Sequence, residues 1–302
     1  MTARRKSDPP RSHDPLVAIG KMADDDIVIG VAALEISRAQ IGQGARLSDF
    51  PMAAYLRHLD VLVRDVRSYA GDDGDRTVIQ AEALCQVLAR RYGYAAGNLD
   101  HEFDPDDTLF SSVIDRRAGS APSLVALYLH VANTLGWTAE AIHFPTRPML
   151  RLGAQQRIII DPYYGGQQLE PHELRAMLKA EEGDGVELAF EQCGTLSSRE
   201  LLYHMHSPLK DRYLLDGDHH NALRATEILR AIDPGRAILW RDAGVLHARL
   251  EQVEEAVHAL EVFLAKASDD TRRYQTSVLL QDLRARLSRP PGLGSPKIRP
   301  LR

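Results

Sequence analysis

The sequence predicts an α+β domain followed by an all-α helical segment. Apolar residues at helical spacing dominate the first part of the chain. Short apolar segments bounded by turn residues follow and predict strands at Ala139–Phe144, Met149–Leu152 and Gln156–Ile160. Further along, Asn221–Pro234 aligns with Glu255–Ser268 at an interval of 34 residues, which indicates a helical repeat.

Composition limits the classes of protein to consider. A chain of 302 residues with 44% hydrophobic content can bury a sizeable core. No apolar run is long enough to cross a membrane, and the first residues lack the apolar core of a signal peptide, so we expect a cytoplasmic protein. Cys85 and Cys193 are the 2 cysteines, too few for a disulfide framework and not spaced for zinc.

Charge argues against nucleic acid as a partner. The net charge is -5, but residues 1–15 sum to +2 and residues 289–302 to +4, so the region between them carries -11. An acidic body repels phosphate backbones. The tails at 1–15 and 288–302 are also rich in Pro, Ser or Gly, and we expect both to be disordered.

Three helices are expected in the first part of the chain, before the acidic loop. They cover Ile27–Ser37, a segment starting near Phe50-Pro51, and Thr77–Tyr92. Cys85 falls on the apolar face of the third helix, where we expect a buried, inert thiol.

An acidic loop follows the third helix. Asp104, Asp106 and Asp107 resemble a calcium loop, but the central Gly and closing Glu of an EF-hand are missing. We therefore expect these carboxylates to cap a short helical turn and to pair with Arg116 and Arg117.

The next helix carries the first residue of chemical interest. Ser120 is the expected N-cap, Pro122 fits the first turn, and Gly136 ends the helix. Ser123 lies in the first turn, where free N–H groups and the helix dipole would lower the pKa of a thiol. A serine hydroxyl gains far less there, because it needs an adjacent general base.

Asp161 ends the third predicted strand, where a carboxylate is well placed to orient a base on the neighbouring strand. That neighbour carries Arg147, whose guanidinium does not deprotonate in proteins. An ion pair between Arg147 and Asp161 would hold the site still and would not activate it.

An ordered set of segments now supports a resemblance. The segments are YGYAAGN (Tyr92–Asn98), DPDDTLFSSVIDRRAGSAPSLVALYL (Asp104–Leu129), FPTRPMLRL (Phe144–Leu152) and IIIDPYYGGQQL (Ile158–Leu169). With them, the region from about residue 16 to 196 resembles the bacterial SirB-type branch of the transglutaminase-like superfamily, whose members carry tetratricopeptide repeats after this domain.

The resemblance implies a papain-like α+β fold. Active members of the superfamily use a cysteine at the start of the central helix, a histidine on the next strand and an aspartate on the one after. By position, the cysteine falls at or beside Ser123, the histidine falls at Arg147, and only the aspartate is kept, as Asp161. His130 and His143 lie too far along their elements to replace the histidine, and we expect both to be structural.

The C-terminal part matches the tetratricopeptide pattern. A 34-residue period is the length of that repeat, and Trp240, Gly244 and Ala256 fit its large-small-small packing. A capping box at Ser197–Glu200 opens this part, and Gln275–Leu287 is the expected closing helix. The expected domains are therefore 16–196 and 197–287. The Asp216–His220 segment contains potential metal ligands, but its place between paired helices favours a plain turn.

Three functional hypotheses remain open. The first is a non-catalytic, regulatory scaffold that binds a protein or peptide through its helical repeats. The second is a hydrolase or acyltransferase that uses Ser123 with an unidentified base, and the third is a small-molecule or metal sensor. We favour the first, since a nucleophile without a nearby base loses about 10²-fold or more in rate. We expect no cofactor, no metal, no nucleic acid and no membrane; oligomeric state is left open.

Overall fold

The structure is a computed structural model that describes residues 14–42, 49–71, 76–97, 104–183, 193–268 and 270–288. Contacts divide the chain into two compact units. We call Met22–His206 the N-terminal unit, and Met1–Lys21 together with Ser207–Arg302 the helical unit. The division falls inside helix α8 (Ser198–Leu215). The boundary expected at 196/197 stays a prediction, and the expected tails lie almost wholly outside the described residues.

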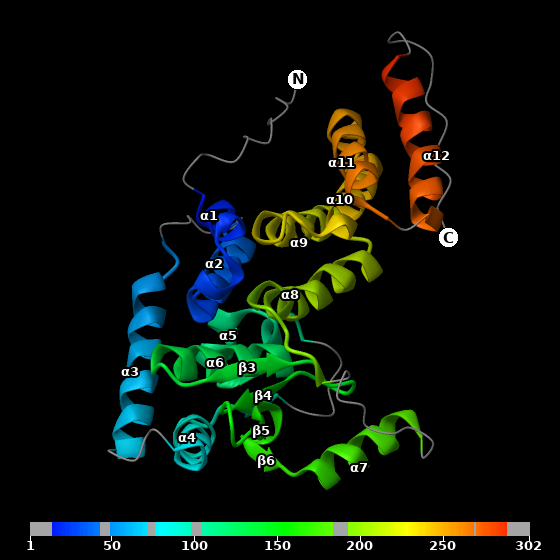
Figure 1. The fold of residues 1–302 in the computed structure, drawn as a ribbon. Coiled ribbons are helices and arrows are strands. Elements are labelled where there is room, and N and C mark those ends of the chain that lie inside the picture. The colour runs from blue at the N-terminus through cyan, green and yellow to red at the C-terminus, as the bar shows by residue number, and fades with distance from the viewer. Residues whose placement is uncertain are drawn as a thin grey trace. The chain divides into compact units, whose positions relative to one another are not determined.

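In the described residues, the N-terminal unit contains six complete α-helices and a small sheet (Figure 1). The helices are α2 (Ile29–Ile41), α3 (Met52–Ala70), α4 (Thr77–Leu84), α5 (Phe110–Arg116), α6 (Ala121–Thr134) and α7 (Pro171–Glu182). Of these, α4, α6 and α7 contact the sheet. A π-helical segment, Cys85–Arg91, continues α4, and 3₁₀ turns lie at Asp24–Asp26, Pro105–Asp107 and Pro162–Tyr164.

Helix α6 is the centre of this unit. Eleven of its residues are buried, and its neighbours include α2, α3 and the strands β3 and β4. A helix that is apolar on nearly every side has to be covered on every side. This burial fixes the first turn of α6, which carries Ser123, relative to the sheet.

The main sheet has 4 antiparallel strands in the order β3-β4-β5-β6. They are β3 (Ala139–Ile142), β4 (Met149–Leu152), β5 (Ile158–Asp161) and β6 (Gln167–Leu169). The sequence did not predict β6. The outer edge of β3 is bridged by Thr195, and α7 packs its buried residues Leu174 and Leu178 on the sheet against Ile142 and Met149.

A second, two-stranded sheet lies next to the start of α6. Strand β1 (Ala95–Ala96) runs parallel to β2 (Ala118–Gly119). Arg117, just before β2, has a φ of 57°, a left-handed conformation that non-glycine residues adopt at an energetic cost. This sheet joins the end of the π-helical segment to the segment that enters α6.

The entry and exit of the N-terminal unit are tied together at Asp24. Its carboxylate accepts hydrogen bonds from the backbone N–H groups of Ser198 (2.6 Å) and Arg199 (3.1 Å), the first residues of α8. An anion at a helix N-terminus satisfies free N–H groups and interacts favourably with the helix dipole. The expected capping box is also present, since Ser197 and Glu200 exchange backbone and side-chain hydrogen bonds.

The helical unit consists of consecutive packed helices. After α8 come α9 (His219–Ile232), α10 (Ala237–Arg249), α11 (Val253–Lys266) and α12 (Asp270–Leu287). Gly244 lets α10 and α11 approach closely, because an added Cβ would lie 2.5 Å from Leu260 Cδ2. The closing helix begins at Asp270, earlier than the expected Gln275. Throughout the described residues, every helix falls short of the length and apolarity that crossing a bilayer requires.

The first helix of the chain belongs to the helical unit. Helix α1 (Pro15–Lys21) packs on α9 and buries Leu16 and Ile19. Gly20 makes this contact possible, since an added Cβ would lie 2.1 Å from the carbonyl oxygen of Ala231. The expected boundary at residue 16 instead assigns this helix, apart from Pro15, to the first domain.

Candidate functional site

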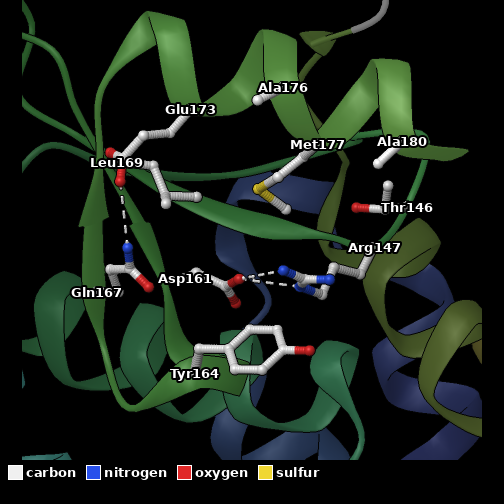
Figure 2. Close-up of a pocket in the computed structure, with 10 residues that line it drawn as sticks. All are labelled: Thr146, Arg147, Asp161, Tyr164, Gln167, Leu169, Glu173, Ala176, Met177 and Ala180. Carbon is white, nitrogen blue, oxygen red and sulfur yellow. Dashed lines mark hydrogen bonds and ion pairs between the residues drawn. The ribbon is translucent and has the colours of Figure 1, made fainter.

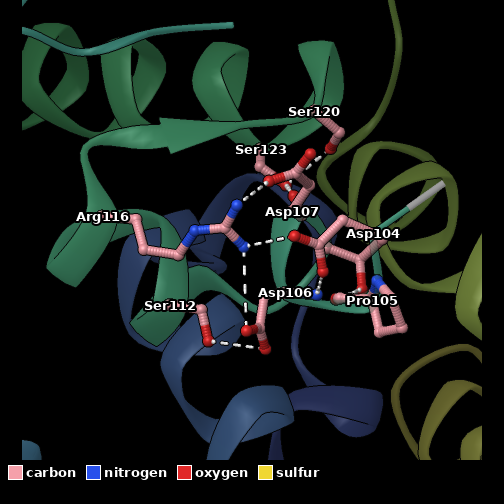
Figure 3. A network of polar contacts seen from close by, with 9 residues as sticks. Asp104, Pro105, Asp106, Asp107, Ser112, Arg116, Ser120 and Ser123 are labelled. Atoms are coloured by element: carbon pink, nitrogen blue, oxygen red, sulfur yellow. Dashed lines mark hydrogen bonds and ion pairs between the residues drawn. The ribbon is translucent and has the colours of Figure 1, made fainter. Parts of the chain in front are cut away.

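The hydroxyl of Ser123 is buried and bonded within the protein. Ser120 is the N-cap of α6 and Pro122 lies in the first turn, as expected. Ser123 is fully buried, and its Oγ donates to the backbone carbonyl of Asp107 at 3.1 Å (Figure 3). The Oγ of Ser120 lies 2.8 Å away and supplies the second partner. A carbonyl and a hydroxyl are poor proton acceptors, so neither activates Ser123 as a nucleophile.

An arginine gathers the acidic loop that holds Asp107 in place (Figure 3). Arg116 contacts Asp104 at 2.7 Å, Asp106 at 3.7 Å and Asp107 at 3.4 Å. Burial raises the pKa of the Asp107 carboxyl, and the nearby Arg116 opposes that change. Arg117, the other expected partner, instead donates to the backbone carbonyl of Tyr92 at 3.1 Å. The aspartates therefore serve as a structural ion-pair network.

Arg147 and Asp161 form the expected ion pair (Figure 2). The guanidinium donates from Nε (2.9 Å) and Nη2 (2.7 Å) to the same carboxylate oxygen, Oδ2. Oδ1 accepts the backbone N–H of Tyr163 at 3.0 Å. Asp161 is 1% exposed, and the Arg147 guanidinium also lies 4.6 Å from the ring centre of Tyr164. Both oxygens of the carboxylate thus have donors, and one of those donors is a permanent cation.

Hydrogen bonds do not join this ion pair to the Ser123 network in the described part of the chain. His130 is buried in α6, where its ring faces Gly30 of α2, and burial lowers its pKa. His143 is exposed just beyond β3. Ser123, Arg147 and Asp161 therefore do not form a connected proton relay in the described residues. That they hold the three positions implied by the resemblance stays a prediction.

Cys85 differs from the expectation of a core thiol. It is half-buried at the start of the π-helical segment, and its Sγ lies 3.5 Å from the carbonyl of Gly165. Gly166, which follows Gly165, has a φ of 76°. A Cβ added to Gly166 would lie 3.1 Å from the hydroxyl of Tyr128 and 3.2 Å from Cys85 Cα. The pair of glycines is needed because this turn combines left-handed backbone with close approach.

A pocket of about 510 Å³ adjoins the ion pair and was not predicted from the sequence. It lies between β6, the end of β5 and helix α7 (Figure 2). Its lining residues are Thr146, Arg147, Asp161, Tyr164, Gln167, Leu169, Glu173, Ala176, Met177 and Ala180. One signal was available in the sequence: Ala176 and Ala180 are small residues four positions apart, which places them one turn apart on α7.

The Asp216–His220 segment forms a turn and a helix cap. Asp218 is the N-cap of α9 and accepts the backbone N–H of Asn221 at 3.1 Å. His219 Nδ1 lies 2.7 Å from the carbonyl of Gly217. Across the residues that the structure describes, no group of three or more His, Cys, Asp or Glu side chains is arranged to hold a metal ion.

Comparisons with known proteins show the family of this chain. The family model described as transglutaminase-like superfamily matches residues 53–207, and the tetratricopeptide repeat model matches residues 209–281. Protein SirB1 of Salmonella typhimurium is 28% identical over 250 residues, which cover 80% of this chain and 91% of that protein. The UPF0162 protein YchA of Escherichia coli is 27% identical over 251 residues, with the same two coverages. The first match spans just over half of the 302 residues, so the chain belongs to the transglutaminase-like superfamily.

Proposed function

We propose that this protein is a non-catalytic, regulatory scaffold that binds a protein or peptide. The observation that supports this most directly is the ion pair between Arg147 and Asp161. A carboxylate in this position orients a base in active relatives, whereas here it is bound by a guanidinium that cannot take up a proton.

The environment of Ser123 argues against the alternative, a hydrolase or acyltransferase. Its hydroxyl is fully buried and donates to a backbone carbonyl, so a substrate carbon would have to displace existing contacts to reach it. A nucleophilic serine also needs a base within hydrogen-bond reach. The partners of Ser123 in the described residues, a carbonyl and the Ser120 hydroxyl, do not fill that role.

The helical unit supports partner binding. Tetratricopeptide arrays present extended surfaces that commonly bind other proteins. On the closing helix α12, Tyr274 is 73% exposed and Val278 is 51% exposed, one turn apart on the same face. Exposed large apolar side chains that are adjacent on one helix are typical of a protein interaction surface. We expect the partner to be a cytoplasmic protein or peptide.

A capture experiment tests the binding proposal. The full chain, carrying an affinity tag, is cross-linked in bacterial lysate, and captured proteins are identified by mass spectrometry. We expect the double variant Tyr274→Ser/Val278→Ser to lose a specific partner. Leu215→Ser is the matched control, because Leu215 is an exposed apolar residue of the same unit, 85% exposed, outside α12. Equal capture by the parent chain and the double variant would contradict this surface as the binding site.

The absence of catalysis is tested separately with Ser123→Ala. The parent protein and the variant are incubated with acyl esters and with peptide amides, and product is measured over many hours. We expect the two rates to be equal to each other and to the rate without protein. A parent rate that Ser123→Ala abolishes would overturn the non-catalytic proposal in favour of the hydrolase.

A further inference from the structure

The pocket beside the ion pair has an apolar floor and one wall of small side chains. Ala176 and Met177 each lie three or four residues from Glu173 and from Ala180, so these four side chains line one side of α7. Met177 and the opposite residue Leu169 pack on the apolar core between α7 and the sheet. The two alanines leave room that larger side chains would fill, and a volume of about 510 Å³ is typical of ligand sites.

Two hydrogen-bond donors at this pocket are unused. Thr146 Oγ1 is buried and has no hydrogen-bond partner in the part of the chain that the structure describes. Arg147 uses Nε and Nη2 on Asp161, which leaves Nη1 without a partner among the described residues. Both residues line the pocket (Figure 2). An unpartnered buried hydroxyl is costly, so a ligand oxygen that accepts from it would stabilise the site.

The acidic side chains of the pocket are already occupied. Asp161 accepts from Arg147 and from the backbone of Tyr163. Glu173 accepts from Gln167 Nε2 at 3.3 Å and from the backbone N–H of Glu170 at 2.8 Å. The pocket therefore offers donors to a ligand more readily than acceptors.

Charge selects among the ligands that could accept these bonds. The charged lining residues are Arg147, Asp161 and Glu173, so the pocket carries one positive and two negative groups. Arg147 is neutralised by Asp161 at 2.7 Å, whereas the donors to Glu173 are uncharged amides. An anionic ligand would be repelled by the remaining negative charge, and a neutral carbonyl would not.

The neighbouring strand favours an extended ligand. Strand β6 lies at the end of the sheet order, and no described strand pairs with its outer edge. Gln167 and Leu169, two residues apart on β6, both face the pocket. A peptide that adds to such an edge places alternate side chains into an adjacent pocket.

We propose that this pocket binds one apolar side chain of an extended peptide, whose neutral backbone carbonyl accepts hydrogen bonds from Thr146 Oγ1 and Arg147 Nη1. The proposal rests on the proposed scaffold function and locates a peptide contact in the N-terminal unit, in addition to the helical repeats. Arg147 thereby acts as a binding residue at the position where the resemblance implies a histidine.

The test uses N-acetyl-L-leucine amide as the probe and the full chain as the protein. Methionine methyl groups are labelled with ¹³C, and the Met177 signal is assigned from its loss in Met177→Leu. We expect the Met177 signal to shift in a saturable way, with a Kd on the order of millimolar for so small a ligand. The signal of Met205, in α8, should stay in place. No shift of Met177 at any attainable probe concentration would overturn the proposal.

Two comparisons make the test specific. N-acetyl-L-leucine, which carries a carboxylate, should bind more weakly than the amide, and tighter binding of the acid would overturn the charge argument. Ala176→Trp should weaken amide binding by about tenfold or more, since the indole fills the pocket. His172→Trp, on an exposed part of α7 outside the pocket, is the matched control and should bind like the parent. Equal binding by both tryptophan variants would also overturn the proposal.

Failure here is distinguishable from failure of the scaffold function. Probe binding is measured with purified protein and needs no cellular partner. Loss of probe binding with intact partner capture removes the pocket proposal alone. Probe binding without any captured partner would support the pocket proposal and contradict the binding role proposed for α12.

Discussion

Replacing Arg147 with methionine would leave the carboxylate of Asp161 buried without its cation. Asp161 is 1% exposed, whereas the Arg147 side chain is 19% exposed, so the buried member of the pair is the one that would be stranded. Removing one partner of a buried ion pair costs about 3–5 kcal/mol. In a unit of this size, that loss corresponds to a decrease in Tm of about 6–20 °C.

Removing the charge of Asp161, with Arg147 kept, should lower the unfolding free energy less. Asp161→Asn keeps one oxygen, which can accept either from Arg147 or from the backbone of Tyr163, because these donors now bind different carboxylate oxygens. The guanidinium can still reach solvent. We expect a loss of about 1–2 kcal/mol, since a charge-assisted hydrogen bond is replaced by a neutral one. The double variant should lose less than the two single variants together, because neither charge is then stranded.

The two tryptophans allow the N-terminal unit to be followed alone. Trp137 lies in the N-terminal unit and Trp240 in the helical unit, so Trp240→Phe leaves one fluorescent reporter for the unit that holds the ion pair. Urea unfolding of this background, with and without Arg147→Met, gives the free-energy difference. The reasoning would be refuted if the chains with and without Arg147→Met had the same urea midpoint and slope. A larger loss of unfolding free energy for Asp161→Asn than for Arg147→Met would also refute it.

Three further predictions concern other parts of the molecule. Ser123→Ala should lower the unfolding free energy by about 1 kcal/mol through loss of its buried hydrogen bonds, and an unchanged urea midpoint would contradict a structural role. Gly20→Ala should destabilise the helical unit by about 1–3 kcal/mol because its Cβ would meet a carbonyl oxygen at 2.1 Å, whereas Gly235→Ala, with 3.6 Å of clearance, should not; Trp240 fluorescence during heating compares them. Burial alone would lower the pKa of His247, but the Glu227 carboxylate 3.6 Å away and a hydrogen bond outweigh it and raise that pKa above 6.5. Protonated His247 therefore stabilises the fold fully below pH 6.5, and this contribution is lost as the pH rises through the raised pKa. The Tm of the helical unit should fall above pH 6.5, and His247→Gln should make the Tm depend less on pH.

Sequence patterns predicted the features that depend on local rules. The capping box at Ser197–Glu200 places the start of α8, since its hydrogen bonds connect residues only three apart. The 34-residue period predicted the helical repeats, because each repeat contacts its neighbours in the same way. The ion pair of Arg147 with Asp161 followed from two residues at the ends of adjacent strands.

Features that depend on distant contacts were missed. Strand β6 has only 3 residues, Gln167–Leu169, and its pairing with β5 is made by backbone atoms that the residue types do not reveal. The sequence predicts only one short helical turn in the loop that contains helix α5, because the 7 residues Phe110–Arg116 are too few for a clear helical stripe. Cys85 begins a π-helical segment, a change of helix type that the pattern of apolar residues does not predict, and it is half-buried with its Sγ 3.5 Å from the carbonyl of Gly165. The pocket also depends on how α7 lies against the sheet.

The tie between Asp24 and the start of α8 has a consequence for folding. Helix α1 packs on α9, although the whole N-terminal unit separates these two helices in the sequence. Closing a flexible loop of that length costs on the order of 5 kcal/mol in chain entropy. The hydrogen bonds from Ser198 and Arg199 to Asp24 already hold the two ends of that unit together. We therefore expect ribosome-bound chains to complete the N-terminal unit first, after which α1 needs only a short connector to find its place. Asp24→Ala should slow that last step, so that α1 remains open to protease for longer after synthesis.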